Sequence, residues 1–473
     1  MKKFCCEVFM FRRYIGDRAF YRRAMIIALP IIIQNAITNF VSLLDNVMVG
    51  QVGQLPMNGV AIVNQLIFVF NLCIFGAVSG AGIFTAQFHG CDDQEGIRRT
   101  FRYKFIAGVL VTAIGIAVFL TAGKPLILMF MQGDDAPADI AATLGFGWDY
   151  LILMLFGLLP FALANVYSST LRETGRTVVP MVAGLIAVFV NLVLNYILIF
   201  GHLGFAPMGV RGAAVATVIS RYVELAIVVF WSHLNPKKCP YIQGVYRSLY
   251  IPAGLLKQIL IKGLPLMLNE LLWASGMTFL NQCYSTRGLD VVSAVNICST
   301  LNNLSSVVFL SLGGVVGIIM GQMLGAGVPE PELRDTNRKL IALSVVSCLL
   351  FGGISAGVSG LFPQIYDTSA AAKNIATVLI CLYAAFMPIH AYNHGCYFTL
   401  RSGGKTTITF VFDSGFVWLI NVPLAFCLSR FTAMPIVPLY AICLSTDLIK
   451  CVLGTYMLKK GDWIQNLAKA QKA

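Results

Sequence analysis

Long apolar stretches, separated by short polar or charged segments, run along almost the whole chain. Each stretch is long enough to cross a bilayer as a helix, which takes about 20 residues. Apolar and polar residues do not alternate at every second position, as they would in a membrane β-barrel. The pattern predicts an all-α integral membrane protein. Its twelve expected transmembrane helices cover residues 24–50, 58–88, 105–131, 145–170, 178–200, 209–232, 261–285, 291–324, 340–362, 374–400, 406–430 and 434–457.

The amino-acid composition agrees with this pattern. Only 12% of the residues are charged, whereas soluble domains average about 25%. The mean hydropathy is +0.78. The spans at 105–131 and 340–362 are nearly free of charged residues, so we expect these two to face lipid.

The 34 lysines and arginines are unevenly distributed. With the N-terminus in the cytoplasm, 27 of them lie in cytoplasmic segments and five in the segments on the opposite side. Such an excess orients membrane proteins. It predicts a multi-pass protein of the inner (plasma) membrane with both termini in the cytoplasm. The net charge of +13 has the same explanation, and we expect no nucleic-acid partner.

The chain contains an internal repeat. At an offset of 235 residues, Leu29-Pro30 aligns with Leu264-Pro265, and Gly82, Gln87 and Gly90 align with Gly317, Gln322 and Gly325. Six spans return the chain to the side where it started, so the halves are parallel repeats. We therefore expect two pseudo-symmetric six-helix bundles, at 24–232 and 261–457. A basic N-terminal segment (1–23), a linker (233–260) and a tail (458–473) would lie in the cytoplasm.

Several spans carry polar residues at membrane depth. In the first, Gln34, Thr38 and Asp45 fall on one helical face. A carboxylate inside a membrane normally faces the bundle interior and has a function. The alternative is that Asp45 reaches the headgroup region and is only solvated.

In the fifth span, Asn191 and Asn195 are four residues apart and share a face. They either bind an ion or hydrogen-bond to a neighbouring helix, which contributes about 0.6 kcal/mol in membranes. Thr217, Arg221 and Glu224 share a face of the sixth span, and Arg221 and Glu224 are spaced to form an ion pair.

The second half carries its own candidates. Glu270 lies in the seventh span, Asp413 in the eleventh, and His390 and His394 are four residues apart in the tenth. Two histidines at this spacing can bind zinc, but no third ligand is evident, so we expect no metal site. Proton exchange suits histidine better, because its imidazole titrates near neutral pH. The sequence does not place Asp447 of the twelfth span.

No motif of a soluble enzyme is present: there is no P-loop, GxSxG or HExxH. We expect neither an enzyme nor an organic cofactor. Energy for moving a solute would come from an H⁺ or Na⁺ gradient, or from the gradient of the solute itself.

The chain resembles the multidrug and toxic compound extrusion (MATE) transporters of prokaryotic type. The resemblance rests on LPIIIQ at 29–34 followed by DNVMVGQVG at 45–53, on the stretch 191–217, and on the twin segments TLRETGRT and TLRSGGKT. It covers residues 20–457. It implies a V-shaped pair of bundles that rock about a central cavity to alternate access, with export of organic, often cationic, amphiphiles in exchange for Na⁺ or H⁺.

The resemblance also implies site residues. Asp45, Asn191, Asn195 and Thr217 match the cation motif of the N-terminal bundle, although Asn195 stands where such members often have Asp. In the C-terminal bundle, Glu270 lies about one turn earlier than the corresponding Glu, and His390 stands near the position of an acid.

We therefore expect an antiporter for small organic molecules that acts in the lipid bilayer as a monomer. Two alternatives remain open at this point. One is a flippase for lipid-linked precursors from the same wider superfamily, which often has fourteen spans and a basic cavity. The other is a membrane-embedded lipid enzyme, which would need polar catalytic groups clustered at one interface.

Overall fold

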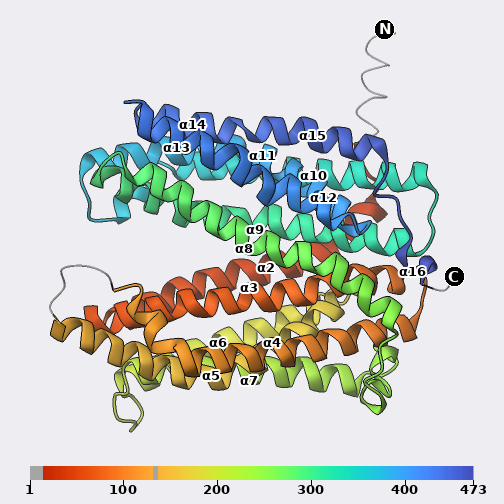
Figure 1. The fold of residues 1–473 in the computed structure, drawn as a ribbon, viewed down its shortest axis with the longest axis horizontal. Coiled ribbons are helices and arrows are strands. Elements are labelled where there is room, and N and C mark those ends of the chain that lie inside the picture. The colour runs from red at the N-terminus through yellow and green to blue at the C-terminus, as the bar shows by residue number, and fades with distance from the viewer. Residues whose placement is uncertain (1–13, 132–136, 472–473) are drawn as a thin grey trace. The chain divides into compact units, whose positions relative to one another are not determined.

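The computed structural model describes residues 14–131 and 137–471, which form helices joined by short loops (Figure 1). The first part of the chain contains α2 (Arg18–Gly50), α3 (Gln54–Gly90), α4 (Gln94–Leu128), α5 (Pro137–Glu173), α6 (Val178–Phe200), α7 (Val210–Leu234), η1 (Pro240–Ile242) and η2 (Val245–Arg247). The second contains α8 (Ala253–Ser285), α9 (Leu289–Gly325), α10 (Glu330–Val358), η3 (Phe362–Ile365), α11 (Ala370–Ser402), α12 (Thr406–Phe410), η4 (Val411–Gly415), η5 (Val417–Asn421), α13 (Val422–Phe431), α14 (Ile436–Ser445), α15 (Asp447–Lys460) and α16 (Leu467–Ala470).

The prediction of an all-α membrane protein is confirmed, and each of the twelve predicted spans is helical. Within the described part of the chain, eleven helical segments are long and apolar enough to cross a membrane. The remaining predicted span is α8. Its 33 residues are sufficient in length, but Lys257, Lys262 and Glu270 reduce its apolar character.

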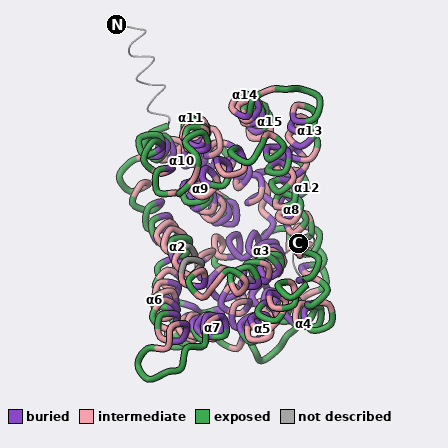
Figure 2. The backbone as a smooth tube through the Cα atoms, turned by 90° about the vertical axis from the view of Figure 1, so that its left-hand side faces the viewer, coloured by how far each residue is buried: buried purple, intermediate pink, exposed green. Residues whose placement is uncertain are grey.

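Burial separates inner helices from outer ones. In the most apolar part of α3 and of α9, 61% of the residues are buried, whereas in α4 the share is 17% and in α10 it is 28%. Figure 2 marks the buried and exposed residues along the backbone. α4 and α10 contain the two spans expected to face lipid, and the repeat partners α3 and α9 have the same buried share.

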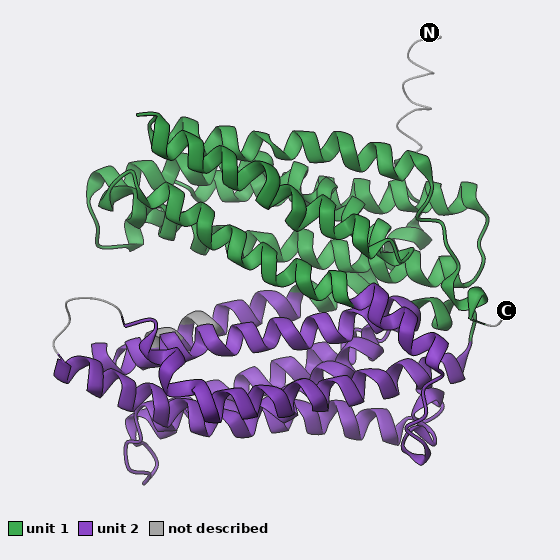
Figure 3. Ribbon diagram, in the orientation of Figure 1, with its two compact units in different colours: residues 1–32, 86–92, 264–473 green, residues 33–85, 93–263 purple. Residues whose placement is uncertain are grey.

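Packing divides the chain into two compact units, which Figure 3 colours separately. One unit comprises Met1–Ile32, Ala86–Asp92 and Leu264–Ala473, and the other Ile33–Thr85 and Asp93–Gly263. The units differ from the two repeat halves because the beginning of α2 and the end of α3 pack with the C-terminal residues. α2 passes from one unit to the other just after Pro30, where proline removes a backbone hydrogen bond.

The unit with Asp93–Gly263 is built on contacts of α7 with α5 and α6, and of α4 with α5. The linker after α7 is fastened to α4: the Arg102 guanidinium donates to the carbonyl of Val245 (2.9 Å), and that of Arg98 donates to the carbonyl of Tyr241 (3.2 Å). From Ala253 onward the predicted linker is already the first part of α8.

In the other unit, α11 packs on α9, α10 and α15. The ends of α3 and α9 also approach closely there. A Cβ atom on Gly90 would lie 1.9 Å from the Gln322 carbonyl oxygen, and one on Gly325 would lie 1.9 Å from the Gln87 carbonyl oxygen. Gly90 and Gln87 are the repeat partners of Gly325 and Gln322. The two contacts are therefore equivalent, and both require glycine.

The Gln87 side chain also holds the C-terminal tail. Its amide nitrogen donates to the carbonyls of Ser402 (2.9 Å) and Gln465 (3.1 Å), and its oxygen accepts from the Leu467 amide (2.6 Å). Trp463 is buried at the same place, with 1% of its surface exposed. The tail is therefore an ordered part of this unit up to residue 471.

Candidate functional site

Four of the predicted residues meet in one polar cluster, which we call the N-terminal polar cluster: Asp45, Asn191, Asn195 and Thr217. α2 supplies the carboxylate, α6 the two amides and α7 the hydroxyl. The two asparagines share a face of α6 because they are one turn apart. Both are buried, with 6% and 2% of their surface exposed.

The Asp45 carboxylate accepts hydrogen bonds from both amides. Asn195 Nδ2 donates to Asp45 Oδ1 at 2.8 Å. With its nitrogen turned toward Asp45, the Asn191 amide donates to Oδ1 and Oδ2 at 3.0 and 3.1 Å, and its oxygen accepts from Thr217 Oγ1 at 3.3 Å. Two neutral donors stabilise the carboxylate without neutralising it.

Cationic and phenolic groups lie around this cluster. Asp45 interacts electrostatically with Arg221 and Tyr150. Arg221 forms the ion pair with Glu224 that the spacing predicted, at 3.3 Å. Tyr150 donates to Asn64 Oδ1 at 3.3 Å, which joins α5 to α3.

The cluster contains the oxygen atoms that a small hard cation requires. Asp45, both amides and Thr217 all carry oxygens, and Asn195 Oδ1 is buried without a hydrogen-bond partner. Carboxylate, amide and hydroxyl oxygens are ligands for hard cations. A proton on Asp45 would neutralise the same carboxylate. The arrangement therefore suits either H⁺ or Na⁺.

The other two predicted residues of α2 lie outside this cluster. Gln34 is about three turns from Asp45 along the helix. Its side chain packs against Gly184 of α6, where a Cβ atom would lie 2.9 Å from Gln34 Nε2. Gln34 Oε1 is buried without a hydrogen-bond partner. Thr38 lies between Gln34 and Asp45 on the same helix.

The predicted residues of the second half also come together, and Asn269, Asp447 and Lys450 join them. We call this group the C-terminal polar cluster, and it consists of Asn269 and Glu270 (α8), His390 and His394 (α11), Asp413 (η4), and Asp447 and Lys450 (α15).

Two ion pairs organise this cluster. His390 Nδ1 lies 2.8 Å from Asp447 Oδ2. Lys450 Nζ lies 3.0 Å from Asp413 Oδ1, and Asn269 Nδ2 donates to the other carboxylate oxygen at 3.1 Å. Asp413 is therefore held by both an ammonium and an amide.

Asp447, which the sequence did not place, lies in this cluster, and so does Lys450, which was not a predicted site residue. Their spacing contained the signal, because residues three apart share a helical face and charged residues in a span normally face a bundle interior. Arg221 and Glu224 have the same spacing in the sixth span. No group of three potential ligands from histidine, cysteine, aspartate and glutamate forms a metal centre within residues 14–131 and 137–471.

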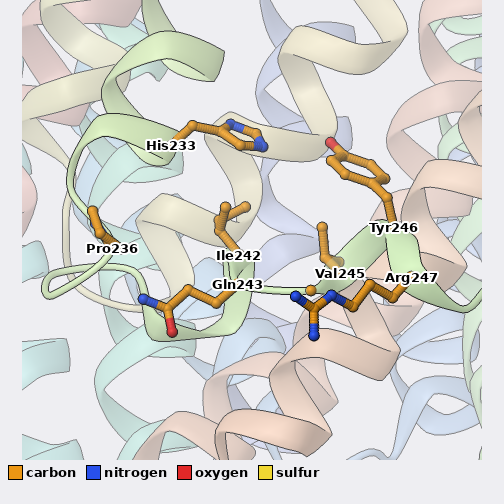
Figure 4. Close-up of a pocket in the computed structure, with 8 residues that line it drawn as sticks. His233, Pro236, Ile242, Gln243, Val245, Tyr246 and Arg247 are labelled. Carbon is orange, nitrogen blue, oxygen red and sulfur yellow. The ribbon is translucent and has the colours of Figure 1, made fainter.

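A surface pocket of about 490 Å³ lies beside the linker, far along the chain from both clusters (Figure 4). Its lining includes His233, Pro236, Gln243, Tyr246 and Arg247. The rings of His233 and Tyr246 stack with their centroids 6.0 Å apart. None of the predicted site residues lines this pocket.

Comparisons with known proteins show the family to which the chain is similar. The model of the family described as MatE matches residues 30–197 and 265–427, once in each half. The probable multidrug resistance protein NorM of Thermotoga maritima is 23% identical over 92% of each chain. The multidrug resistance protein PmpM of Pseudomonas aeruginosa is 26% identical over 88% of this chain and 85% of its own.

Solved structures share the fold. A multidrug resistance MATE family transporter of the MOP superfamily, in an outward-facing conformation, superimposes with a TM-score of 0.84 at 19% identity, over 95% of this chain and 97% of its own. The MOP superfamily transporter of Pyrococcus furiosus with a binding pocket of reverse polarity gives a TM-score of 0.82 at 19% identity, over 95% and 97% of the chains.

Proposed function

Because the chain belongs to the MatE family of membrane transporters, we propose that it exports small organic compounds, mainly cationic amphiphiles, in exchange for H⁺ or Na⁺. Relatives that carry the name multidrug resistance protein support multidrug efflux as the task. The N-terminal polar cluster supports ion coupling, and it is the observation on which the proposal depends.

The role of Asp45 follows from its surroundings. A carboxylate buried in a membrane protein is costly unless it binds a cation or pairs with one. Here its closest partners are the neutral amides of Asn191 and Asn195. Binding of a proton or a Na⁺ ion would neutralise Asp45 and favour one conformation of the transporter, and the substrate would favour the other.

The energetics require such an exchange. Moving one positive charge outward against a potential of about 100 mV costs about 2.3 kcal/mol. Inward movement of one coupling cation offsets this cost for a monovalent substrate. The cluster has one carboxylate, because Asn195 is an amide, so we expect one coupling cation at this site.

The test is efflux of the cationic dye ethidium from proteoliposomes that contain the purified protein, under an imposed pH or Na⁺ gradient. Asp45→Asn should lower gradient-driven efflux by about tenfold or more, since a factor of ten corresponds to only ~1.4 kcal/mol of coupling. Asp149→Asn is the matched control, because this carboxylate is exposed and pairs with exposed Arg211 at 2.8 Å. Efflux that ignores both gradients would contradict antiport, and unchanged coupling in Asp45→Asn would exclude this site.

A further inference from the structure

The surface pocket beside the linker has no role in the function proposed above (Figure 4). We propose that it binds an anionic glycerophospholipid of the cytoplasmic leaflet, whose phosphate is held by the Arg247 guanidinium. The lipid head group would lie in the pocket and its acyl chains against neighbouring apolar side chains. The proposal uses the predicted cytoplasmic position of the linker and does not depend on which compound is exported.

The position and size of the pocket fit a lipid head group. His233 belongs to the last turn of α7, which is long and apolar enough to span a membrane, and the other lining residues come from the linker directly after it. The end of a span is the level at which lipid head groups lie. The pocket volume of about 490 Å³ falls within the range of about 300–1,000 Å³ that is typical of small-molecule sites.

The chain that forms the pocket is strongly basic. Between Glu224 and Glu270 it contains five lysines and arginines and no acidic residue. On the neighbouring α4, three arginines pair with a single carboxylate, that of Glu95. Basic clusters next to a membrane span attract the anionic lipids of the cytoplasmic leaflet. The charge of this surface is therefore complementary to such a lipid.

Arg247 supplies the group that would bind the phosphate. Its side chain is exposed, and within residues 14–131 and 137–471 its guanidinium forms no hydrogen bond or ion pair. The guanidinium of Arg102, by contrast, donates to backbone carbonyls of the linker. In Figure 4, Arg247 and Gln243 lie on one side of the pocket and the rings of His233 and Tyr246 on the other. A guanidinium without a protein partner can bind a phosphate with two parallel hydrogen bonds.

The pocket is held in shape by the helices behind it. The turn between η1 and η2 passes through Gly244, whose φ of +71° favours glycine. The Arg102 guanidinium donates to the carbonyl of Val245 at 2.9 Å, and the hydroxyl of Tyr246 hydrogen-bonds to that of Tyr167 in α5. A site whose backbone is already ordered loses little conformational entropy when a ligand binds.

Exposed apolar side chains next to the pocket residues favour a lipid over a free anion. Leu234, at the end of α7, is 77% exposed, and Leu249 and Tyr250, just after η2, are 56% and 68% exposed. Acyl chains would cover these side chains, and tyrosine is typical of the membrane interface. A soluble phosphate would leave them in water. The ligand that uses both the guanidinium and the apolar side chains is a phospholipid.

The experiment is native mass spectrometry of the full chain, delipidated in detergent and titrated with phosphatidylglycerol or with phosphatidylcholine of the same acyl chains. We expect the first phosphatidylglycerol to bind about tenfold more tightly, because it carries a net negative charge. Arg247→Gln should weaken this binding by about tenfold, as expected for the loss of one charge-assisted contact. Arg247→Lys keeps the charge without the planar fork and should give an intermediate affinity. Equal affinities for the two lipids would overturn the proposal.

Lys237→Gln is the matched control, because it removes an exposed cation of the same linker that does not line the pocket. It should weaken binding by about twofold at most, as expected for a solvent-screened charge. Equal losses in Lys237→Gln and Arg247→Gln would show diffuse attraction by the linker and contradict a site in the pocket. Without lipid, the melting temperature of Arg247→Gln should equal that of the wild type. Phosphatidylglycerol should raise it more in the wild type than in Arg247→Gln.

Two soluble anions distinguish a lipid site from a phosphate site. Neither inorganic phosphate nor glycerol phosphate should displace phosphatidylglycerol, because neither can cover the apolar side chains. Displacement by either anion would identify a site for soluble phosphates and would also overturn the proposal. Because nothing is transported in this measurement, its result is independent of the efflux test at Asp45.

Discussion

At the scale of single residues, one buried cation of the N-terminal half is compensated by its neighbours. The Lys104 side chain of α4 is fully buried and pairs with Glu173 of α5. Its ammonium also donates to the hydroxyls of Ser169 (3.3 Å) and Thr170 (3.2 Å). Three acceptors for three N–H groups make this burial tolerable. The pair fastens α4 to α5 next to the beginning of the span in α4 and at the end of α5.

Removal of the Lys104 ammonium alone should therefore destabilise the fold more than removal of both charges of the pair. Lys104→Met leaves Glu173 without its cation and should lower the free energy of unfolding by about 3–5 kcal/mol. Lys104→Met combined with Glu173→Gln should recover much of this loss, because no uncompensated charge remains. Thermal unfolding of the purified variants in detergent measures both. If Lys104→Met alone were as stable as the wild type, the pair would not carry buried charge.

At the scale of helices, the crossing of α3 and α9 depends on two glycines. The contacts at Gly90 and Gly325 involve backbone carbonyls rather than flexible side chains, so the helices themselves must move to accept a methyl group. Glycine in a helix costs about 1 kcal/mol relative to alanine. The close approach explains why both repeats have it at this position.

Gly325→Ala should accordingly destabilise the protein, by about 1–3 kcal/mol as expected for an overpacked site. The matched control is Gly314→Ala in the same helix, where a Cβ atom has nothing within 4 Å. The control should match or exceed the wild type in stability, because alanine favours the helix. Melting temperatures of the two variants decide between the outcomes, and equal destabilisation by both would point to a general effect of replacing glycine.

At the scale of the whole molecule, the asymmetry of lysine and arginine predicts how the protein is oriented in the membrane. The linker and the tail, both ordered against helix ends, are basic segments, while the loop between α6 and α7, residues 201–209, contains neither lysine nor arginine. Basic segments remain in the cytoplasm. The two sides of the membrane are therefore expected to differ in the lysine and arginine content of the segments that face them.

This orientation predicts the outcome of reporter fusions in a bacterial inner membrane. Green fluorescent protein at the C-terminus should fluoresce, because the charge asymmetry predicts that the tail lies in the cytoplasm. Alkaline phosphatase inserted after Gly204, in the exposed loop that follows α6, should be active. The same enzyme inserted after the exposed Lys237 of the linker is the control and should be inactive. Activities in the reverse order would invert the topology.

The sequence by itself determined the helices and their number. A transmembrane helix needs a long apolar run, and such runs can be seen directly in the sequence of both repeat halves. It also predicted Asp45, Asn191, Asn195 and Thr217 as site residues, because each is polar in an apolar run and matches the motif of the resemblance, and the structure brings these four together. Their spacing within helices predicted shared faces, such as that of Arg221 and Glu224, since helical geometry is local.

Only the tertiary structure decided which faces meet. The twelfth span breaks at Thr446 between α14 and α15, and the eleventh contains the wide turns η4 and η5. Such π-helical turns change which side a residue faces, so periodicity did not place Asp413 opposite Lys450. The pairing of His390 with Asp447 joins residues 57 positions apart, from different helices. Contacts between residues so far apart in sequence depend on how the helices pack against one another. The residue pattern within a single helix does not predict that packing.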